Sequence, residues 1–583
     1  MKNITSYMPA AKGKIVQGTA ENYSSYSNDA PAQIVNTRAV GAYGLFQVYE
    51  PQSEYTQADF LQNPDVFTSV FVHFSSVENA RGVIDSLRGF AVRFYTRDGS
   101  FDLIGNNIPV AFVQGKRPVL TDVSNQDVHF DLPQTASAQD VFWNGVASSP
   151  ESMHALMWAM SDRALPRSVA MMEGFGSNSF RLTNAQGKSF IARFHWKPVL
   201  GVHSLVWDEA VKLAARDADF HRQHLWDLID QEHYPEWELG VQIIPEDEQH
   251  TFSFDLLDPT KLIPESLVPV RIIGKLVLNR NPENYSAESD LVAFHSGHLV
   301  PGIDLAVADI ERTEKMSADG NAFNDHYSQA ALFWRSQSTW EQNHIIAAFC
   351  FALAKVSVPA IRVRMLAHLI RINPSFAQVV ARGLGMELPA MPEQSENSAD
   401  TNTLVMDPSL SMKDSRKDSI VGRHIAVLVE NGFESERFVV LRESLIAGGA
   451  RVKIIAPRLG EVTCKHGRNF HIDYSLLTVG SVMFDAVFIP GGHLSVEALC
   501  KNANAVLFVK ETYKHGKAIG ASDEGGMLIT RAARSSIMSD SFKGPGLVIA
   551  PLGSDSKVFA QRFVDAVAQH RFIERPDLDA VVA

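Results

Sequence analysis

The 583-residue sequence has few cysteines, no excess of basic residues and no long apolar run, and each of these absences excludes a class of protein. Three cysteines without metal-ligand spacing build neither a disulfide framework nor a zinc site. The net charge of −13 argues against nucleic-acid binding, which favours a basic face. The apolar stretch 345–354 is too short to cross a bilayer and predicts a buried helix.

The first residues contain no apolar segment of the kind that marks a secretory signal, so we expect a cytoplasmic, reducing location and no membrane contact. A phosphate-binding P-loop, a GxGxxG fingerprint and internal repeats are also missing. The remaining composition, 45% apolar and 20% charged, is that of an ordinary globular protein.

Periodicity divides the chain into four parts. Short β-rich runs such as 66–74 and 89–95, separated by turns, predict a large antiparallel sheet or barrel with helical insertions. Apolar residues at three- and four-residue spacing then predict helices over about 328–385. The expected divisions are an N-terminal arm at 1–30, a barrel and helical region at 31–388, a polar linker at 389–420 and a further domain at 421–583.

The last part alternates strands and helices. Strands are expected at 424–430, 451–456, 486–489, 518–521 and 547–550, with helices at 435–446 and about 556–570. This order predicts a doubly wound parallel sheet of flavodoxin-like type.

Several long, irregular runs before the linker resemble the haem catalases, especially the large-subunit type with an additional C-terminal domain. They occur in family order and include FDLIGNNIP (101–109), MWAMSDRALPRS (157–168), RFHWKP (193–198) and LLDPTKLIPESLVPVRIIGKLVLNRNPENY (256–285). The resemblance implies an α+β fold built on an eight-stranded antiparallel barrel, a tetrameric assembly, and haem-dependent dismutation of hydrogen peroxide in the oxidative-stress response.

The residues expected at the distal side of the haem depart from the family. Asn36 stands at the position of the distal histidine, and an amide does not shuttle a proton near neutral pH. Ser75 and Asn106 match the family's distal serine and asparagine. The rest of the expected haem pocket is vestigial, with Arg38 beside three replacements: Gln33 and His73 for arginines, and Ala111 for an aromatic residue.

The proximal side departs further. Family members bind iron through the tyrosine of an R-x-x-x-Y motif that follows the VPG run at some distance. Here VPGID (300–304) is followed by a short segment without this motif, and the family pattern resumes at 332–334. Tyr327 matches the aromatic residue that precedes this run better than it matches the ligand.

Substitute metal ligands remain an alternative. His295, His298 and His326 are the candidates for iron, but the first two belong to a run that already matches the family. His221 and His224 share a helix face, with His233 nearby, yet lack the carboxylate of an HExxH motif. We therefore predict no metal site.

The C-terminal domain resembles the intracellular-protease and glutamine-amidotransferase-like superfamily. The similarity lies in ENGFES (430–435), VFIPGGH (487–493) and KAIGASDEGGMLIT (517–530). Active relatives carry a cysteine followed by a histidine at a strand-to-helix elbow. Here Asp523 replaces the cysteine and Glu524 replaces the histidine, while Glu434 and Glu436 of the family's acidic motif are present.

Both candidate active sites thus lack the residues of their families. We expect a catalase-related pseudoenzyme or scaffold without a cofactor, which self-associates as a dimer or tetramer and binds no nucleic acid. The alternative is a working haem catalase or peroxidase with a non-standard iron ligand.

Overall fold

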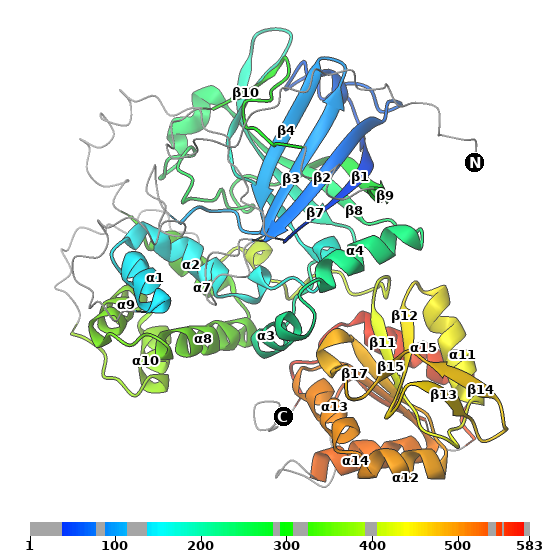
Figure 1. Cartoon of the computed structure of the whole chain (residues 1–583). Helices are drawn as coiled ribbons and strands as arrows, with labels where there is room; N and C mark the ends of the chain where they lie inside the picture. Colours follow the sequence, from blue (N-terminus) through cyan, green and yellow to red (C-terminus); the bar gives the residue numbers. More distant parts are fainter. Residues whose placement is uncertain are drawn as a thin grey trace.

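The computed structural model describes residues 38–76, 88–112, 137–283, 292–306, 325–390, 405–534, 544–550 and 553–575. Figure 1 shows a barrel, a group of helices beneath it, and a separate domain beside α3 and α4. The barrel with helices and the C-terminal α/β sheet agree with the fold class that the sequence predicts.

Eight antiparallel strands close into a ring, because β7 pairs with both β5 and β8. They are β1 (Arg38–Val48), β2 (Thr68–Ser76), β3 (Arg88–Thr96), β4 (Gly99–Asn106), β5 (Gly174–Gly176), β7 (Ser189–Pro198), β8 (Glu236–Pro245) and β9 (Arg271–Arg280). The short strands β6 (Phe180–Thr183) and β10 (Ile303–Leu305) extend the sheet beyond β7. The predicted antiparallel barrel is confirmed.

Alternating residues of these strands fill the barrel interior with large apolar side chains. Phe74, Phe90, Trp196 and Trp237 are all at most 2% exposed. Their rings contact one another at centroid distances of 4.7–5.9 Å, the range in which aromatic pairs attract. The interior is therefore a packed core, and any ligand site must lie on the outer face or at an end of the barrel.

The helical region packs around one apolar cluster. Its helices are α1 (Ala138–Ala147), α2 (Met153–Ala159), α7 (Ser328–Ser336), α8 (Thr339–Ala354), α9 (Pro359–Ile372) and α10 (Pro374–Gly383). Prolines occupy the first positions of α9 and α10, where a missing N–H costs nothing. Two further helices, α3 (Trp207–Arg216) and α4 (Phe220–Asp230), face the C-terminal domain.

The C-terminal domain is a six-stranded parallel sheet with helices on both faces. Its strand order is β15 (Tyr474–Ser475), β12 (Arg451–Ala456), β11 (His424–Leu428), β16 (Ala486–Ile489), β17 (Ala518–Ser522), β18 (Leu547–Ala550). A hairpin, β13 (Gly460–Thr463) and β14 (Asn469–Ile472), stands beside it, and the helices are α11 (Glu436–Ala447), α12 (His493–Lys501), α13 (Ala503–Lys514), α14 (Gly526–Arg534) and α15 (Ser556–Ala568). The doubly wound sheet is as predicted.

The segment expected as a linker, 389–420, is only partly described. Residues 391–404 lie outside the described part, whereas 405–420 pack on the rest of the chain with Leu410 and Met412 buried. The Asp407 carboxylate accepts hydrogen bonds from the Ser266 backbone at 3.2 Å and the Ser409 hydroxyl at 2.7 Å. The polar residues of this stretch therefore serve as bonding partners, and the domain boundary itself stays a prediction.

Among the helices in the described ranges, none is both long and apolar enough to cross a membrane. The apolar stretch 345–354 lies within α8, whose Ile345, Phe349 and Leu353 are buried. The predicted helix is confirmed, but it is buried on one face only, because Ala347, Phe351 and Ala354 are exposed.

Candidate functional site

The outer face of β1–β4 carries the residues expected at the distal side of a haem. Gly89 of β3 pairs with Ser75 of β2 on one side and with Asn106 of β4 on the other. Directly paired residues of antiparallel strands point to the same face, so Ser75 and Asn106 share it, about 10 Å apart across two strand spacings. His73, two residues before Ser75, lies on this face as well.

An apolar cluster covers part of this face. Phe71, Ala91 and Ile104 come from three neighbouring strands, and Phe294, from the segment that precedes the VPG run, packs against them. The His73 ring lies 5.9 Å from the Phe294 ring, and His73 is 3% exposed. The position of a family arginine is thus occupied by a buried imidazole in an apolar setting.

The remaining pocket residues are dispersed. The Ser75 hydroxyl is buried without a hydrogen-bond partner among the described residues. Asn106 is exposed and donates to the Ser177 hydroxyl at 3.2 Å. Ala111 is exposed, and its backbone N–H donates to the Pro259 carbonyl at 2.7 Å. The structure therefore brings His73 and Ser75 together and leaves Ala111 at the surface.

Three predicted site residues cannot be placed by their side chains. Gln33 and Asn36 lie outside the described residues. Arg38 begins β1 and pairs with Ser76, and only its backbone is described. The position of the family's distal base stays a prediction from the sequence.

The candidate substitute ligands already have partners. The Asp102 carboxylate, fully buried, lies 2.7 Å from His298 Nδ1, accepts from the His295 backbone N–H at 2.9 Å, and pairs with Arg93. The Gly297 backbone N–H donates to His295 Nδ1 at 2.8 Å. Burial lowers the pKa of His326, and Lys261 lowers it further. These contacts give His295 and His298 a structural role on the barrel surface.

Tyr327 belongs to the helical region. Its hydroxyl lies 2.7 Å from His368 Nδ1, and the Arg371 guanidinium lies 4.0 Å from its ring. Burial raises the pKa of Tyr327, although Arg371 opposes the shift. An iron-bound tyrosine is a phenolate whose oxygen must be free to reach the metal. The Tyr327 hydroxyl is instead engaged by His368, so Tyr327 is better explained as a structural residue of the helical region.

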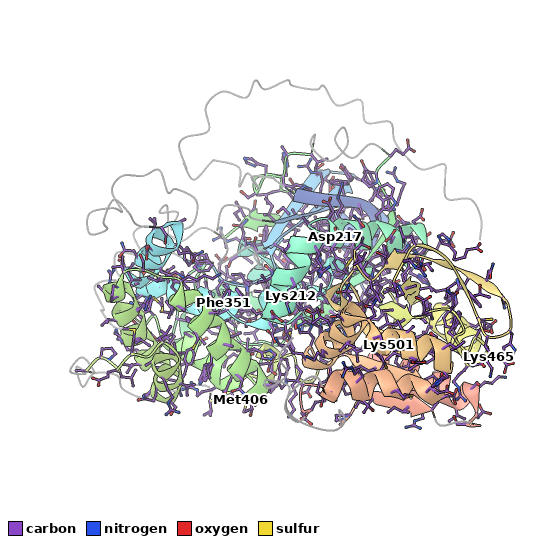
Figure 2. All side chains as sticks on the ribbon, turned by 60° about the horizontal axis from the view of Figure 1, so that its bottom comes forward. Lys212, Asp217, Phe351, Met406, Lys465 and Lys501 are labelled. Atoms are coloured by element: carbon purple, nitrogen blue, oxygen red, sulfur yellow. The ribbon has the colours of Figure 1, made fainter. Side chains whose placement is uncertain are left out.

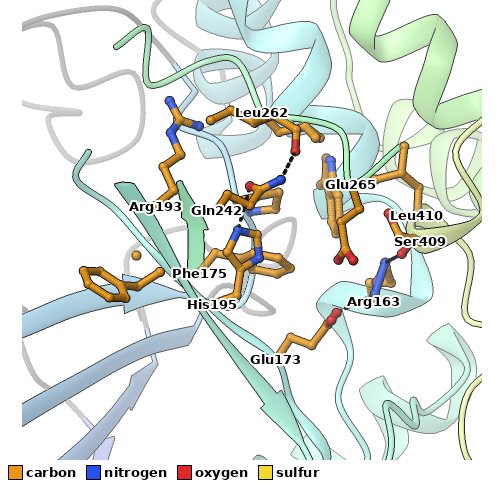
Figure 3. A pocket seen from close by; sticks show the side chains of 15 residues that line it. Arg163, Glu173, Phe175, Arg193, His195, Gln242, Leu262, Glu265, Ser409 and Leu410 are labelled. Atoms are coloured by element: carbon orange, nitrogen blue, oxygen red, sulfur yellow. Dashed lines mark hydrogen bonds and ion pairs between the residues drawn. The ribbon is translucent and has the colours of Figure 1, made fainter. Parts of the chain in front are cut away.

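A cavity of about 30 Å³ lies where the barrel meets the helical region (Figure 3). His195 and Gln242 line it together with the ion-paired Arg163 and Glu173. The Gln242 amide nitrogen donates to two backbone carbonyls, so its oxygen faces His195 Nε2 at 3.1 Å. His195 thus carries its proton on Nε2.

The other ring nitrogen of His195, Nδ1, is buried with no partner among the described residues. Burial lowers the pKa of His195 to about 3, and Lys197 adds to the effect. The cavity can therefore hold a small hydrogen-bond donor such as one water molecule. Sequence reasoning did not single out His195, although it lies in the RFHWKP run that carries the resemblance.

The second candidate site is the elbow between β17 and α14. Asp523 has a φ of +49°, in the left-handed region that non-glycine residues adopt rarely. Its Oδ1 is buried without a partner in the described structure. Burial raises the pKa of Asp523, Arg437 opposes this, and the neighbouring Glu524 and Glu434 add to it.

The Glu524 carboxylate occupies the backbone donors at this elbow. It accepts from the Gly492 N–H at 3.0 Å, and that bond and its own N–H lower the pKa of Glu524. An acyl-transfer enzyme needs such N–H groups free for the substrate's oxyanion. With Asp523 at the nucleophile position and Glu524 on the donors, the elbow does not present the groups of a cysteine hydrolase.

Of the histidines considered for a metal, His224 has both ring nitrogens engaged by other groups. His224 Nε2 donates to the Gly422 carbonyl at 2.7 Å, and its Nδ1 lies 2.8 Å from the Ser168 hydroxyl. Glu434, Glu436 and His466 are the one ligand group close enough for a metal in the described ranges. Lys465 Nζ lies 3.9 Å from Glu434 and competes for that carboxylate.

Comparison with known proteins agrees with this architecture. The chain matches the Catalase family model at residues 19–310, the Catalase-related immune-responsive model at 320–384 and the DJ-1/PfpI family model at 423–533.

Curated relatives are similar over most of their length. Catalase-2 of Bacillus subtilis (strain 168) is 40% identical over an alignment that covers 94% of this chain and 89% of that protein. Catalase HPII of Mycobacterium avium is 39% identical, with 95% and 90% covered, and Catalase-1 of Neurospora crassa is 36% identical, with 86% and 79% covered. The chain therefore belongs to the catalase family, in the form that carries a C-terminal DJ-1/PfpI domain.

Proposed function

We propose that this chain is a non-catalytic member of the catalase family, a pseudoenzyme that keeps the family's frame as a scaffold and has lost peroxide dismutation. The observation that carries the proposal is the missing iron ligand. Between Leu305, the end of β10, and Tyr327 the sequence contains no tyrosine, and Tyr327 bonds His368 within the helical region.

The length of the relatives supports a deletion. The alignment with the Bacillus subtilis protein extends over 629 positions, more than the 583 residues of this chain. Relatives therefore carry residues with no counterpart here. The family models leave residues 311–319 unmatched, the interval in which the sequence shortens.

The residues present do not fit a catalytic haem. Haem in this family requires an anionic proximal ligand and a distal proton carrier, and the chain offers Asn36 for the second. Gln33 and His73 replace the arginines expected near the haem, and His73 is buried beside Phe294. We derive no haem-dependent step for this chain.

A scaffold role is consistent with the parts of the family fold that this chain retains. The barrel core, the helical cluster and the C-terminal sheet are all retained with large apolar cores. We propose a cytoplasmic homo-oligomer, dimer or tetramer, which works by binding and not by turnover.

The absorption spectrum of the purified protein tests the proposal. The chain is expressed with a haem precursor beside the Bacillus subtilis relative as a positive control, and haem per chain is measured. We expect no Soret band from this chain. A stoichiometric Soret band would contradict the pseudoenzyme proposal and favour a substitute iron ligand.

Oxygen evolution from hydrogen peroxide is the second measurement. Loss of a positioned general base alone lowers rates by about 10²–10⁴-fold. Asn36→His restores only this group, so we expect neither the wild type nor this variant to evolve oxygen. Robust oxygen evolution from the wild-type chain would overturn the proposal.

A further inference from the structure

The boundary between the barrel domain and the C-terminal domain contains four buried histidines, each in contact with the other domain. Figure 2 shows Lys212 of α3 at this boundary, where it pairs with Glu511 of α13 at 2.9 Å. The histidines are His203 and His224 from the barrel domain and His515 and His570 from the C-terminal domain, all at most 7% exposed. Because four imidazoles are buried at one domain boundary, the protonation state of each must follow from its hydrogen bonds and from the charges nearby.

The hydrogen bonds of His570 require its neutral form. Arg423 Nη1–H donates to His570 Nδ1 at 2.7 Å, so this nitrogen must keep its lone pair. His570 Nε2–H donates across the boundary to the Ser204 carbonyl at 2.7 Å. A proton on Nδ1 would break the first bond and place an imidazolium against a guanidinium.

His224 of α4 forms a second cross-boundary bond. Its Nε2–H donates to the Gly422 carbonyl at 2.7 Å, at the entry to the C-terminal sheet. The Ser168 hydroxyl lies 2.8 Å from Nδ1 and receives the Ala170 N–H, so it donates its own proton to that nitrogen. The His424 ring lies 5.3 Å away, so a second proton would face another imidazole.

The fixed charges around these rings are mostly positive. Arg167 binds Asp485 through two hydrogen bonds of 2.7 and 2.6 Å, and Arg423 lies 3.5 Å from the same carboxylate. Beside them, Lys517 and Arg571 share the buried Glu209. Four buried cations thus surround two buried carboxylates, Asp485 and Glu209, so neither of these carboxylates is left to pair with an imidazolium at His570 or His224.

The other two buried histidines, His203 and His515, lie near the same charged groups. The His203 ring lies 4.8 Å from that of His570, where it faces Arg423, Asp485 and the backbone of Leu200 and Arg416. His515 differs, because its Nε2 lies 3.0 Å from the partly exposed Asp208, with Glu209, Lys517 and Arg571 also near. His515 therefore has a carboxylate partner, and His570 and His224 do not.

We propose that this boundary is an acid-released latch: the two domains are locked at neutral pH and separate when His570 and His224 take up protons. The proposal concerns the coupling of the domains and is independent of whether the chain binds haem. Under this proposal the pH of the surroundings decides whether the C-terminal domain is docked on the barrel domain or separated from it.

The sign and size of the effect follow from linkage. Burial holds the pKa of His570 well below its usual value, with Arg423 and Arg571 adding to the shift and Asp485 opposing it. Burial lowers the pKa of His224 to about 3, helped by Arg167 and Arg423 and opposed by Gly422 and Asp485.

In the separated state solvent reaches both rings, and their pKa values rise toward the free value of about 6.5, although Arg423 stays beside His570 within the C-terminal domain. Separation therefore becomes more favourable as the pH falls below about 6.5, by at most about 30-fold per histidine, or about 10³-fold for the pair, between pH 7.5 and 5.

Hydrogen–deuterium exchange of the full chain, corrected for the intrinsic pH dependence of exchange, measures the opening. We expect peptides 199–206 and 566–575 to lose protection steeply between pH 6.5 and 5, while β2 and β3 keep theirs. The dependence of opening on pH should correspond to more than one proton taken up. Unchanged protection of the boundary at pH 5, or its loss together with β2 and β3, would overturn the proposal.

A matched pair of variants identifies the groups. In His570→Gln the amide oxygen still accepts from Arg423 and the amide nitrogen still donates to Ser204, without a titrating group. We expect its opening at pH 5 to fall relative to the wild type, by at most about 30-fold. The control is His471→Gln, an exposed histidine of β14, which should leave the profile unchanged. Equal profiles for His570→Gln and the wild type would contradict the role of His570.

Discussion

Asp485 is the carboxylate on which arginines from both domains converge. Arg167 of the barrel domain and Arg423 of the C-terminal domain both contact it, and the Asp485 side chain is 1% exposed. Burial alone would raise the pKa of Asp485, but Arg167 and Arg423 hold it well below its usual value. A single residue thus keeps two buried guanidinium groups compensated.

Asp485→Asn should therefore destabilise the protein strongly. Removing one partner of a buried ion pair costs about 3–5 kcal/mol, because the remaining charges stay uncompensated. Thermal unfolding at pH 7.5 measures the loss. The control is Glu497→Gln, which removes an exposed pair with Lys501 on α12 and should leave the midpoint unchanged. Equal midpoints for Asp485→Asn and the wild type would contradict the account of this cluster.

At the elbow between β17 and α14, the sequence predicts which residues occupy the site but not which groups they bond. The motif places Asp523 at the strand-to-helix turn, and the φ of +49° confirms that position. The Glu524 carboxylate accepts from the Gly492 N–H, which is 32 positions away, so this bond cannot be predicted from a local sequence pattern. The residue type is therefore readable from the sequence, but its bonding partner is not.

At the scale of single elements, periodicity predicted most boundaries closely. The strand expected at 486–489 is β16, the strand expected at 451–456 is β12, and the apolar stretch 345–354 forms the second half of α8, which begins at Thr339. These elements carry their signals locally, as apolar spacing and as a capping box at Ser338. The packed stretch 405–420 was missed because its polar composition resembles that of a solvated segment.

Asp140 joins the start of α1 to the start of α9. Its carboxylate receives the backbone N–H and the hydroxyl of both Ser137 and Ser357, at distances of 2.7–2.8 Å. Burial would raise the pKa of Asp140, but these hydrogen bonds outweigh it and lower the pKa to about 2. One side chain therefore caps one helix and anchors the entry to another.

Asp140→Ala should loosen both helices. It removes the carboxylate of the α1 capping box, and because Ser137 and Ser357 are exposed, water replaces it at their donors; we expect a cost of about 1–2 kcal/mol. Since the folded pKa is below the unfolded value, the wild-type advantage is complete above pH 4 and disappears as the pH falls toward 2. Hydrogen exchange of peptides 137–147 and 357–372 measures it, with Asp59→Asn at an exposed turn as the control. Wild-type protection in the variant would contradict this assignment.

At the scale of the whole molecule, the contacts between the domains had no signal in the sequence. Arg167 and Asp485 are 318 positions apart, and Asp208 and His515 are 307 apart. Arg167 belongs to the run 157–168, but its partner Asp485 lies in a distant loop, and no local pattern pairs Asp208 with His515. The sequence predicted two domains but could not predict that they share a buried ionic boundary.

The structure also changes the argument for self-association. Most large apolar residues of the runs 66–74 and 256–278 are covered within one chain, since Phe71, Phe74, Leu276 and Leu278 are at most 2% exposed. Phe67, Leu267 and Ile272 of the same runs are exposed, as single apolar residues of a protein surface often are. The homo-oligomer thus stays a prediction that rests on the family resemblance.

Limited proteolysis combined with light scattering tests the organisation of the whole molecule. Residues 391–404 contain Glu393 and Glu396 in a polar sequence, so protease Glu-C should cut there first. Because Arg167–Asp485 and Glu209–Lys517 join the domains through buried ion pairs, the fragments should stay together at pH 7.5. Scattering should give the same multiple of the 64.3 kDa chain mass before and after cleavage. Release of the C-terminal fragment would contradict the boundary described above, and a mass of one chain would refute self-association.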